Sequence, residues 1–263
     1  MPTIEENKSL WGDAQNWTNA GDEWSKSWGN AQSQWWFSIF PRLQEYVPTD
    51  RILEIAPGFG RWTQFLKNLC KELIVVDMSD LCILECKKRF SSSPNISYHV
   101  NDGKSLEMIP DDSIDFAFSF DSLVHAEDTI LENYIEQLAR KLKPNGVGFI
   151  HHSNLGEYKT FVIRSSHKPI SIINQKMFGL NAGWRAISMT ASKFELFAEK
   201  AGMHTISQEK INWHTRPYFL IDSISVFTRK GSLWDRPNKI LRNNRFMAEA
   251  KQIRKLSELY SSS

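Results

Sequence analysis

Short apolar runs alternate with segments of helical periodicity through the middle of the chain. The first apolar run, residues 51–55, ends in a glycine-containing turn, and a helical pattern follows at 61–69. The later apolar runs lie at 73–77, 96–103, 113–121 and 147–152, and a second helical segment covers 128–142. Apolar strands that alternate with helices are typical of a mostly parallel sheet with helices on both faces. We therefore expect an α/β fold whose ligands bind at the carboxyl ends of the strands.

The turn after the first predicted strand has the composition of a nucleotide-binding turn. Gly58 and Gly60 remove side chains where the backbone must approach a ligand, and the N–H groups of the following helix point into the same space. The next apolar run ends on Asp77, whose carboxylate is placed to accept hydrogen bonds from both ribose hydroxyls. The sequence therefore predicts a nucleotide pocket at this turn.

Residues with chemically useful side chains lie at or near the carboxyl ends of the predicted strands. They are Glu54, Asp77, Asp102, Ser119, Phe120, Asp121, His151 and His152. The carboxyl ends of parallel strands meet at one edge of the sheet, so groups that are distant in the sequence converge on one crevice. We expect a single active site at this edge.

The order of these strands, turns and terminal residues resembles that of the class I S-adenosylmethionine-dependent methyltransferases, strongly over residues 51–154 and less specifically to residue 229. The resemblance implies a Rossmann-like, seven-stranded, mostly parallel sheet and S-adenosylmethionine as the cofactor. In the family's pattern Asp77 binds ribose, Met78 packs against adenine and Asp102 reaches the adenine amino group. Ala56 stands where the family usually has a glycine. The implied cofactor-binding residues are Glu54, Ala56, Gly58, Gly60, Asp77, Met78, Asp102, Gly103, Ser119 and Phe120.

Methyl transfer, as the resemblance implies it, needs an aligned acceptor, exclusion of water and, for a hydroxyl acceptor, a group that takes the proton. Histidine suits the last role because its pKa lies near neutrality. We expect His152 or His125 to be the base, with Asp121 orienting it or binding the acceptor. Neighbours on a strand point to opposite faces, so His151 and His152 are not both bases.

Other residues have weaker expected roles at the site. Those expected to contact the acceptor are His151, Asn154, Arg185 and Trp36. His99, His204 and His214 are expected to be structural or exposed. The predicted reaction is methylation of a hydroxyl group on a small molecule, either a sugar or a secondary metabolite of natural product biosynthesis. Methylation of a small amine or peptide is the alternative.

Outside the sheet-forming core, residues 1–50 hold six of the ten tryptophans. Residues 31–46 have the apolar periodicity of an amphipathic helix. Two interpretations stay open: the rings dock this extension on the sheet, or some of them form a lid over cofactor and acceptor. We predict that the chain divides into five parts: the helical extension or lid at 1–50, the cofactor-binding half at 51–154, an acceptor-side helical insert at 155–189, the last helix with an antiparallel strand pair at 190–229, and a C-terminal helical tail at 230–263. We expect this tail to pack on the core or on another subunit of a homo-oligomer.

Composition and charge narrow the function classes. The 263 residues include 32 basic and 30 acidic side chains, a formal net charge of +2, which gives no electrostatic reason to expect a nucleic-acid partner. The three cysteines form no paired or zinc-binding framework, and no metal is expected. No run approaches the ~18 apolar residues of a membrane span, and the first residues lack the pattern of a signal peptide. We expect a cytoplasmic protein that does not bind membranes.

Two other classes share parts of this pattern. An NAD-dependent oxidoreductase would also show a glycine turn and Asp77, but it commonly has a third glycine where this chain has Thr63. A non-catalytic protein could retain the fold and bind the cofactor without turnover, because a fold does not determine a reaction. Methyl transfer explains more of the pattern than either alternative.

Overall fold

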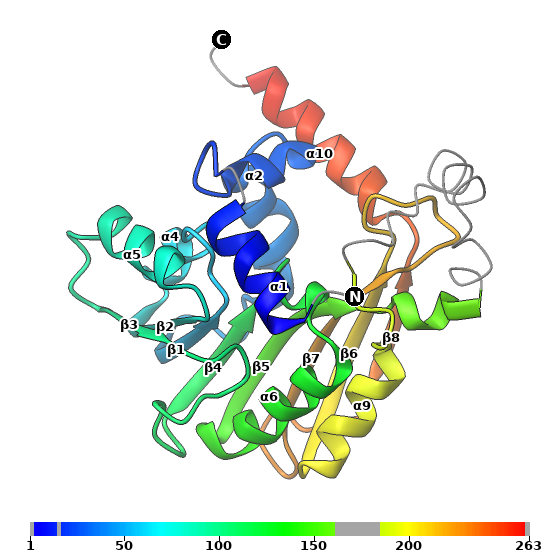
Figure 1. Ribbon diagram of the computed structural model, residues 1–263. Helices are drawn as coiled ribbons and strands as arrows, with labels where there is room; N and C mark the ends of the chain where they lie inside the picture. The colour runs from blue at the N-terminus through cyan, green and yellow to red at the C-terminus, as the bar shows by residue number, and fades with distance from the viewer. Residues whose placement is uncertain (1–2, 15–16, 161–184, 261–263) are drawn as a thin grey trace.

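The computed structural model describes residues 3–14, 17–160 and 185–260, and its centre is an eight-stranded sheet (Figure 1). The strand order is β3, β2, β1, β4, β5, β7, β6, β8. Strands β1 to β5 run parallel, β7 is antiparallel to β5 and β6, and β8 is parallel to β6. The strands are β1 Thr49–Ile55, β2 Cys70–Asp77, β3 Ile96–Val100, β4 Ile114–Ser119, β5 Leu142–Ser153, β6 Met203–Ile211, β7 Asp222–Arg229 and β8 Lys239–Asn243.

Helices cover both faces of the sheet (Figure 1). The α-helices are α1 Ile4–Lys8, α2 Ala31–Gln34, α3 Phe40–Leu43, α4 Thr63–Leu66, α5 Asp80–Arg89, α6 Asp128–Lys141, α9 Ala191–Lys200 and α10 Phe246–Tyr260. The 3-10 and π-helical segments are η1 Ser9–Ala14, η2 Asp22–Trp28, η3 Trp35–Ile39, η4 Leu123–His125 and η5 Leu155–Tyr158. Successive strand residues pack to opposite sides: Ile52 joins the core that contains the N-terminal helices and α10, and Leu53 joins the core that contains α6 and α9. The predicted two-faced α/β arrangement is therefore present.

Buried tryptophans hold the N-terminal extension on one face of the sheet. Residues 31–43 form a continuous helical stretch through α2, η3 and α3, close to the predicted helix at 31–46. Trp28 and Trp35 are fully buried, and the Trp35 ring stacks on Phe65 of α4 with ring centroids 5.0 Å apart. These two rings therefore dock the extension on the sheet, as the first of the two interpretations expects.

The C-terminal region corrects the predicted count of seven strands and the prediction of one continuous helical tail. Lys239–Asn243 form β8, an eighth strand at the edge of the sheet, and α10 begins only at Phe246. The β8 side chains Ile240 and Leu241 are both exposed, so backbone pairing with β6 is what holds the strand. A strand that buries neither face gives no alternation of apolar and polar residues, and it was therefore missed.

The predicted acceptor-side insert falls largely outside the described part of the chain. Of residues 155–189, the structure describes 155–160 and 185–189, so the helical character of the remainder stays a prediction. Among the described helices, none combines the length and the apolar character that a bilayer crossing requires.

Removing the Phe246 ring tests whether α10 belongs to the core. We expect Phe246→Ala to lower the free energy of unfolding by about 3 kcal/mol, because the ring is buried against Trp28 and Trp213 and its loss leaves a cavity. Leu259→Ala, at an exposed position of the same helix, is the control and should change that free energy by less than about 0.5 kcal/mol. Urea unfolding followed by tryptophan fluorescence measures both variants. Equally small effects would show that α10 adds nothing to the core.

Candidate active site

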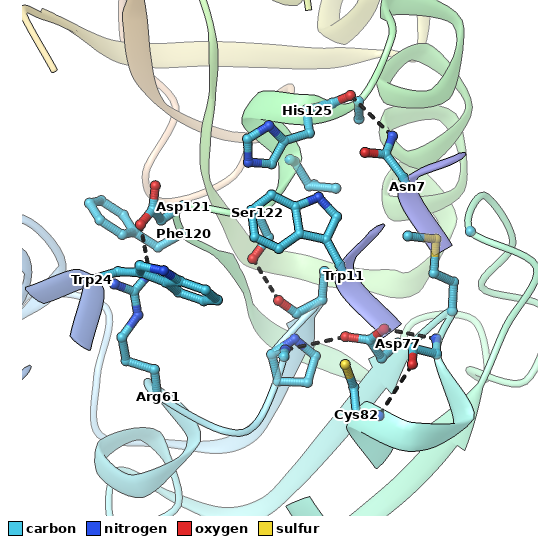
Figure 2. A pocket seen from close by; sticks show the side chains of 18 of the residues that line it. Asn7, Trp11, Trp24, Arg61, Asp77, Cys82, Phe120, Asp121, Ser122 and His125 are labelled. Atoms are coloured by element: carbon cyan, nitrogen blue, oxygen red, sulfur yellow. Dashed lines mark hydrogen bonds and ion pairs between the residues drawn. The ribbon is translucent and has the colours of Figure 1, made fainter. Parts of the chain in front are cut away.

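A cavity of about 610 Å³ lies at the carboxyl ends of the parallel strands (Figure 2). Its floor comes from the turns after β1, β2 and β4, and its walls include the loop after β6 and the N-terminal segment. The N-terminal contribution includes Ile4, Trp11, Trp17 and Trp24. The strand ends therefore meet at one crevice, and N-terminal rings form part of its wall. This volume lies within the range of small-molecule sites.

The turn after β1 adopts a left-handed backbone at three positions. Gly58 and Gly60 have φ angles of 59° and 87°, and Ala56 has a φ of 57°. A Cβ atom on Gly58 would lie 2.7 Å from the Trp17 ring, so glycine is needed for this ring to pack on the turn. Ala56 and Gly58 line the cavity, whereas Gly60 packs beside Phe90. The turn thus joins the cavity floor to its N-terminal wall.

Asp77 ends β2 with its carboxylate at the cavity floor. Its Oδ2 accepts the Gly58 N–H at 3.2 Å, and its Oδ1 accepts the Ser79 N–H at 2.9 Å (Figure 2). Burial raises the pKa of Asp77 to about 6, although these backbone N–H groups act in the opposite direction. Met78 and Ser79 line the cavity beside it. The Asp77 carboxylate therefore lies at the cavity, and its contact with ribose stays a prediction.

Glu54, also predicted to bind the cofactor, lies beneath the cavity floor. Its side chain is buried, Oε2 accepts the Thr63 hydroxyl at 2.6 Å, and Oε1 has no hydrogen-bond partner among the described residues. Burial raises the pKa of Glu54 to about 8; the Thr63 hydrogen bond opposes this rise and the charge of Asp77 adds to it. Glu54 therefore ties β1 to α4 from below, and it is not among the residues that line the cavity.

The turn after β3 brings Asn101 and Gly103 to the cavity, but not Asp102. A Cβ atom on Gly103 would lie 3.0 Å from Ile4 Cγ2, so α1 covers this end of the cavity closely. Asp102 is exposed, and its Oδ1 accepts the backbone N–H groups two and three residues later. The predicted contact of Asp102 with adenine is corrected, because this carboxylate stabilises its own turn.

At the other end of the cavity, Arg61 and Asp121 form a shielded ion pair. Arg61 Nη2 lies 2.7 Å from Asp121 Oδ2, and Arg61 is only 4% exposed. The guanidinium lies 4.5 Å from the Trp62 ring centroid and 5.4 Å from that of Trp24. Figure 2 shows Arg61 beside Trp24. The sequence analysis missed Arg61, because the residues that bury it are distant in the sequence.

A buried network beneath Asp121 fixes its backbone, which has a φ of 64°. His151 Nδ1 accepts the Asp121 N–H at 3.1 Å, so a neutral imidazole has its proton on Nε2, which lies 3.3 Å from Asp222 Oδ2. Asp222 also binds Arg185 through two contacts of 2.6 and 2.8 Å. Burial would raise the pKa of Asp222, but Arg185 and His151 outweigh it and hold this pKa at about 2.

This network changes the roles of two predicted acceptor contacts. Arg185 lines the cavity, as predicted, while its guanidinium is already paired with Asp222. His151 is fully buried and is not among the lining residues, so the prediction that it touches the acceptor is corrected. It acts through Asp121, whose backbone it holds.

His152 lies on the opposite side of the sheet from His151. Its Nε2 is 2.8 Å from Ser225 Oγ, and its ring stacks on Phe194 of α9 with centroids 4.5 Å apart. Burial lowers the pKa of His152 to about 3. Since neighbours on a strand point to opposite faces, only one of the two histidines could turn toward the cavity. The expectation that His152 is the base is wrong.

Three more predicted site residues lie outside the cavity lining. Asn154 is buried and binds two backbone groups, donating to one and accepting from the other. Ser119 is buried within the sheet, whereas its neighbour Phe120 does line the cavity. Trp36 is 45% exposed on the N-terminal helix. In the doublets His151–His152 and Ser119–Phe120 the pleat directs the two side chains to opposite sides, and of the four residues only Phe120 lines the cavity.

Two described histidines line the cavity: His125, as predicted, and His214, which was expected to be structural or exposed. His125 ends η4, and its ring centroid lies 4.9 Å from that of Trp11 (Figure 2). His214 follows β6, which runs in the same direction as β5 because both are antiparallel to β7. Its loop therefore lies at the same carboxyl edge, and this direction was the signal that could have indicated it.

The described residues offer neither a metal centre nor an ionised thiol at the site. No group of three His, Cys, Asp or Glu side chains within the described ranges could hold a metal ion. Cys82 lines the cavity, and burial raises the pKa of its thiol far above the usual range. Asp121 and Asp222 are each paired with an arginine.

Comparisons with known proteins find similarity to methyltransferases. Residues 52–146 match a family model described as a methyltransferase domain. A search of the curated proteins finds no match. Among solved structures, the chain is similar to an S-adenosylmethionine-dependent methyltransferase from Leishmania major, with 10% identity, a TM-score of 0.59 and coverage of 86% of this chain and 82% of that one. It is also similar to a protein from Pyrococcus horikoshii, with 19% identity, a TM-score of 0.56 and coverage of 84% and 96%.

A third similar structure is an S-adenosylmethionine-dependent methyltransferase from Methanosarcina mazei, with 15% identity, a TM-score of 0.54 and coverage of 73% of this chain and 98% of that one. At such low identities these likenesses show the fold. The match over residues 52–146 likens that part of the chain to a methyltransferase domain, and together with these structures it indicates S-adenosylmethionine as the cofactor.

Replacing Asp77 tests the nucleotide end of the cavity. We expect Asp77→Ala to weaken S-adenosylhomocysteine binding by about 100-fold, because the variant loses two hydrogen bonds to a charged acceptor. Asp102→Ala is the matched control, because this exposed carboxylate lies outside the lining, and its affinity should be unchanged. Calorimetric titration measures both. Unchanged affinity in Asp77→Ala would remove the ribose role.

Replacing Glu54 tests the buried carboxyl beneath the floor. Its pKa is about 8 in the folded protein against an ordinary 4.5, so between these values the folded state holds the proton and the unfolded chain releases it. The free energy of unfolding therefore falls as pH rises through this window. In Glu54→Gln, which cannot titrate, we expect the fall between about pH 6 and pH 8.5 to be smaller by on the order of 2 kcal/mol. Urea unfolding at several pH values measures this free energy for both proteins. If it changed equally with pH in the two, the raised pKa of Glu54 would be contradicted.

Proposed function

We propose that this class I methyltransferase transfers a methyl group from S-adenosylmethionine to a hydroxyl oxygen of a small molecule, and that a histidine of the cavity wall takes the hydroxyl proton. One observation supports this most directly. A single cavity joins the glycine turn and Asp77 at one end to an aromatic chamber with histidines at the other. A sugar or a secondary metabolite has a size that such a cavity encloses.

The described residues fit the cofactor. Asp77 would hold the ribose hydroxyls, Met78 and Ile4 would cover the adenine, and the turn from Ala56 to Gly58 would lie against the methionine part. When bound, S-adenosylmethionine supplies a methyl group on a positively charged sulfur, which is already a good electrophile. The protein therefore has to align the acceptor, exclude water and receive a proton.

Aromatic rings surround the space left for the acceptor. They are Trp11, Trp24, Trp62, Phe120 and Trp213. Flat apolar rings pack against a ring-shaped acceptor, exclude water and attract the positive sulfur through their faces. Because Trp11 and Trp24 come from the N-terminal extension, their position supports the interpretation of that extension as a lid.

Methylation of a small amine is the alternative, and Asp121 is the observation that favours it. A carboxylate in an aromatic chamber attracts an ammonium group. The ion pair of Asp121 with Arg61 offsets this negative charge, so the chamber better suits a neutral hydroxyl acceptor.

Calorimetry and an acceptor screen test the proposal together. We expect S-adenosylmethionine and S-adenosylhomocysteine to bind the purified protein with micromolar affinity, and NAD not to bind. With the donor present, phenols and sugars should yield methyl ethers by mass spectrometry at rates above those of amines. Transfer to amines alone would replace the hydroxyl acceptor, and binding of NAD alone would overturn the methyltransferase function.

A further inference from the structure

The loop between β6 and β7 holds His214 in a defined position. Trp213 is buried, and its ring lies 5.0 Å from that of His151. Asn212 Nδ2 donates to the Thr215 carbonyl at 3.1 Å across the loop. Between these anchors His214 has a left-handed φ of 52°, which a histidine adopts only where its neighbours fix it. A strained residue at the edge of a cavity is a candidate for a function.

The surroundings of His214 suit a proton acceptor. The side of the His214 ring that packs into the cavity wall is shielded from water, which lowers its pKa although the residue is exposed at the rim; Asp121 and Asp222 oppose this change and Arg185 adds to it. The shift favours the neutral imidazole, the form that accepts a proton. It lines the cavity, and its nitrogens have no hydrogen-bond partner among the described residues. Asp121 lines the same cavity and its charge acts on His214; it binds Arg61 through Oδ2, and its other carboxylate oxygen has no partner among the described residues.

The other histidines at this edge are engaged elsewhere. His151 accepts the Asp121 N–H, and His152 faces α9. The His125 ring packs on Trp11 of the N-terminal segment, where Asn7 donates to the His125 carbonyl. His214 is therefore the described histidine that combines a place in the lining, a carboxylate nearby and nitrogens open to a ligand.

We propose that His214 is the catalytic base of the methyl transfer and that Asp121 binds the acceptor beside it; this inference rests on the proposed methylation of a hydroxyl group. As the acceptor oxygen bonds to the methyl carbon, its O–H bond breaks and the proton passes to the His214 imidazole, while the electron pair of the methyl–sulfur bond stays on sulfur. His214 is an exposed residue at the cavity rim, so the proton then leaves to solvent.

The test compares His214→Asn with His125→Asn in the 263-residue protein. Asparagine tolerates the left-handed backbone but cannot take a proton. With S-adenosylmethionine as donor and 4-methylphenol and 4-nitrophenol as probe acceptors, we expect His214→Asn to lower kcat for 4-methylphenol by about 100-fold or more. KM and the affinity for S-adenosylhomocysteine should stay unchanged. His125→Asn should lower kcat by less than about tenfold, well below the roughly 100-fold lower bound of a base effect.

The two probes separate a base from a structural residue. The hydroxyl of 4-nitrophenol is more acidic than that of 4-methylphenol and needs less help from a base. The decrease of kcat in His214→Asn should therefore be clearly smaller with 4-nitrophenol. Equal losses for both phenols, or full turnover in the variant, would overturn the role of His214 and leave hydroxyl methylation intact. If the unmodified protein binds S-adenosylmethionine but methylates only amines, the proposed acceptor class fails, and the base with it.

Discussion

The hydrogen bond from the Gly58 N–H to the Asp77 carboxylate is the contact on which the arrangement of the site depends. It joins the turn after β1 to the end of β2, two neighbouring parallel strands, and it helps satisfy a carboxylate that the fold has buried. The left-handed turn that presents this N–H leaves no room for a Cβ atom, since the Trp17 ring occupies that space. One contact therefore determines the floor of the cavity, and the same glycine admits the N-terminal wall.

A second buried cluster joins the antiparallel part of the sheet to this parallel part. Asp222 begins β7 and lies between Arg185 and His151, so its negative charge is balanced in the interior. His151 then holds the backbone of Asp121 at the end of β4. A left-handed aspartate costs free energy by itself, about 1–2 kcal/mol. The cluster offsets this cost, and the Asp121 carboxylate is held at the cavity instead of turning away from it.

The sequence predicts the parts of this structure that depend on short-range pattern. The strands β1 and β2, the glycine turn and Asp77 are local features, and the structure has them at the expected positions. The orientation of side chains in the residue doublets was harder to predict. The pleat separates His151 from His152, but which of them faces α9 is set by the packing of that helix and not by the doublet itself. Buried Arg61 was missed for the same kind of reason: Asp121 and Trp24 surround it only after folding.

The division of the site between sheet and extension has a consequence for specificity. The nucleotide end is built from strand ends that the whole fold holds in place, so it changes little without loss of the sheet. The proposed acceptor end takes Trp11 and Trp24 from the N-terminal segment and His214 from the loop after β6, and neither segment is part of a strand. Loops and extensions accept substitutions more readily than paired strands. On the proposed function, the acceptor end can change while the cofactor end stays the same, which agrees with the general rule that a shared fold does not identify the substrate.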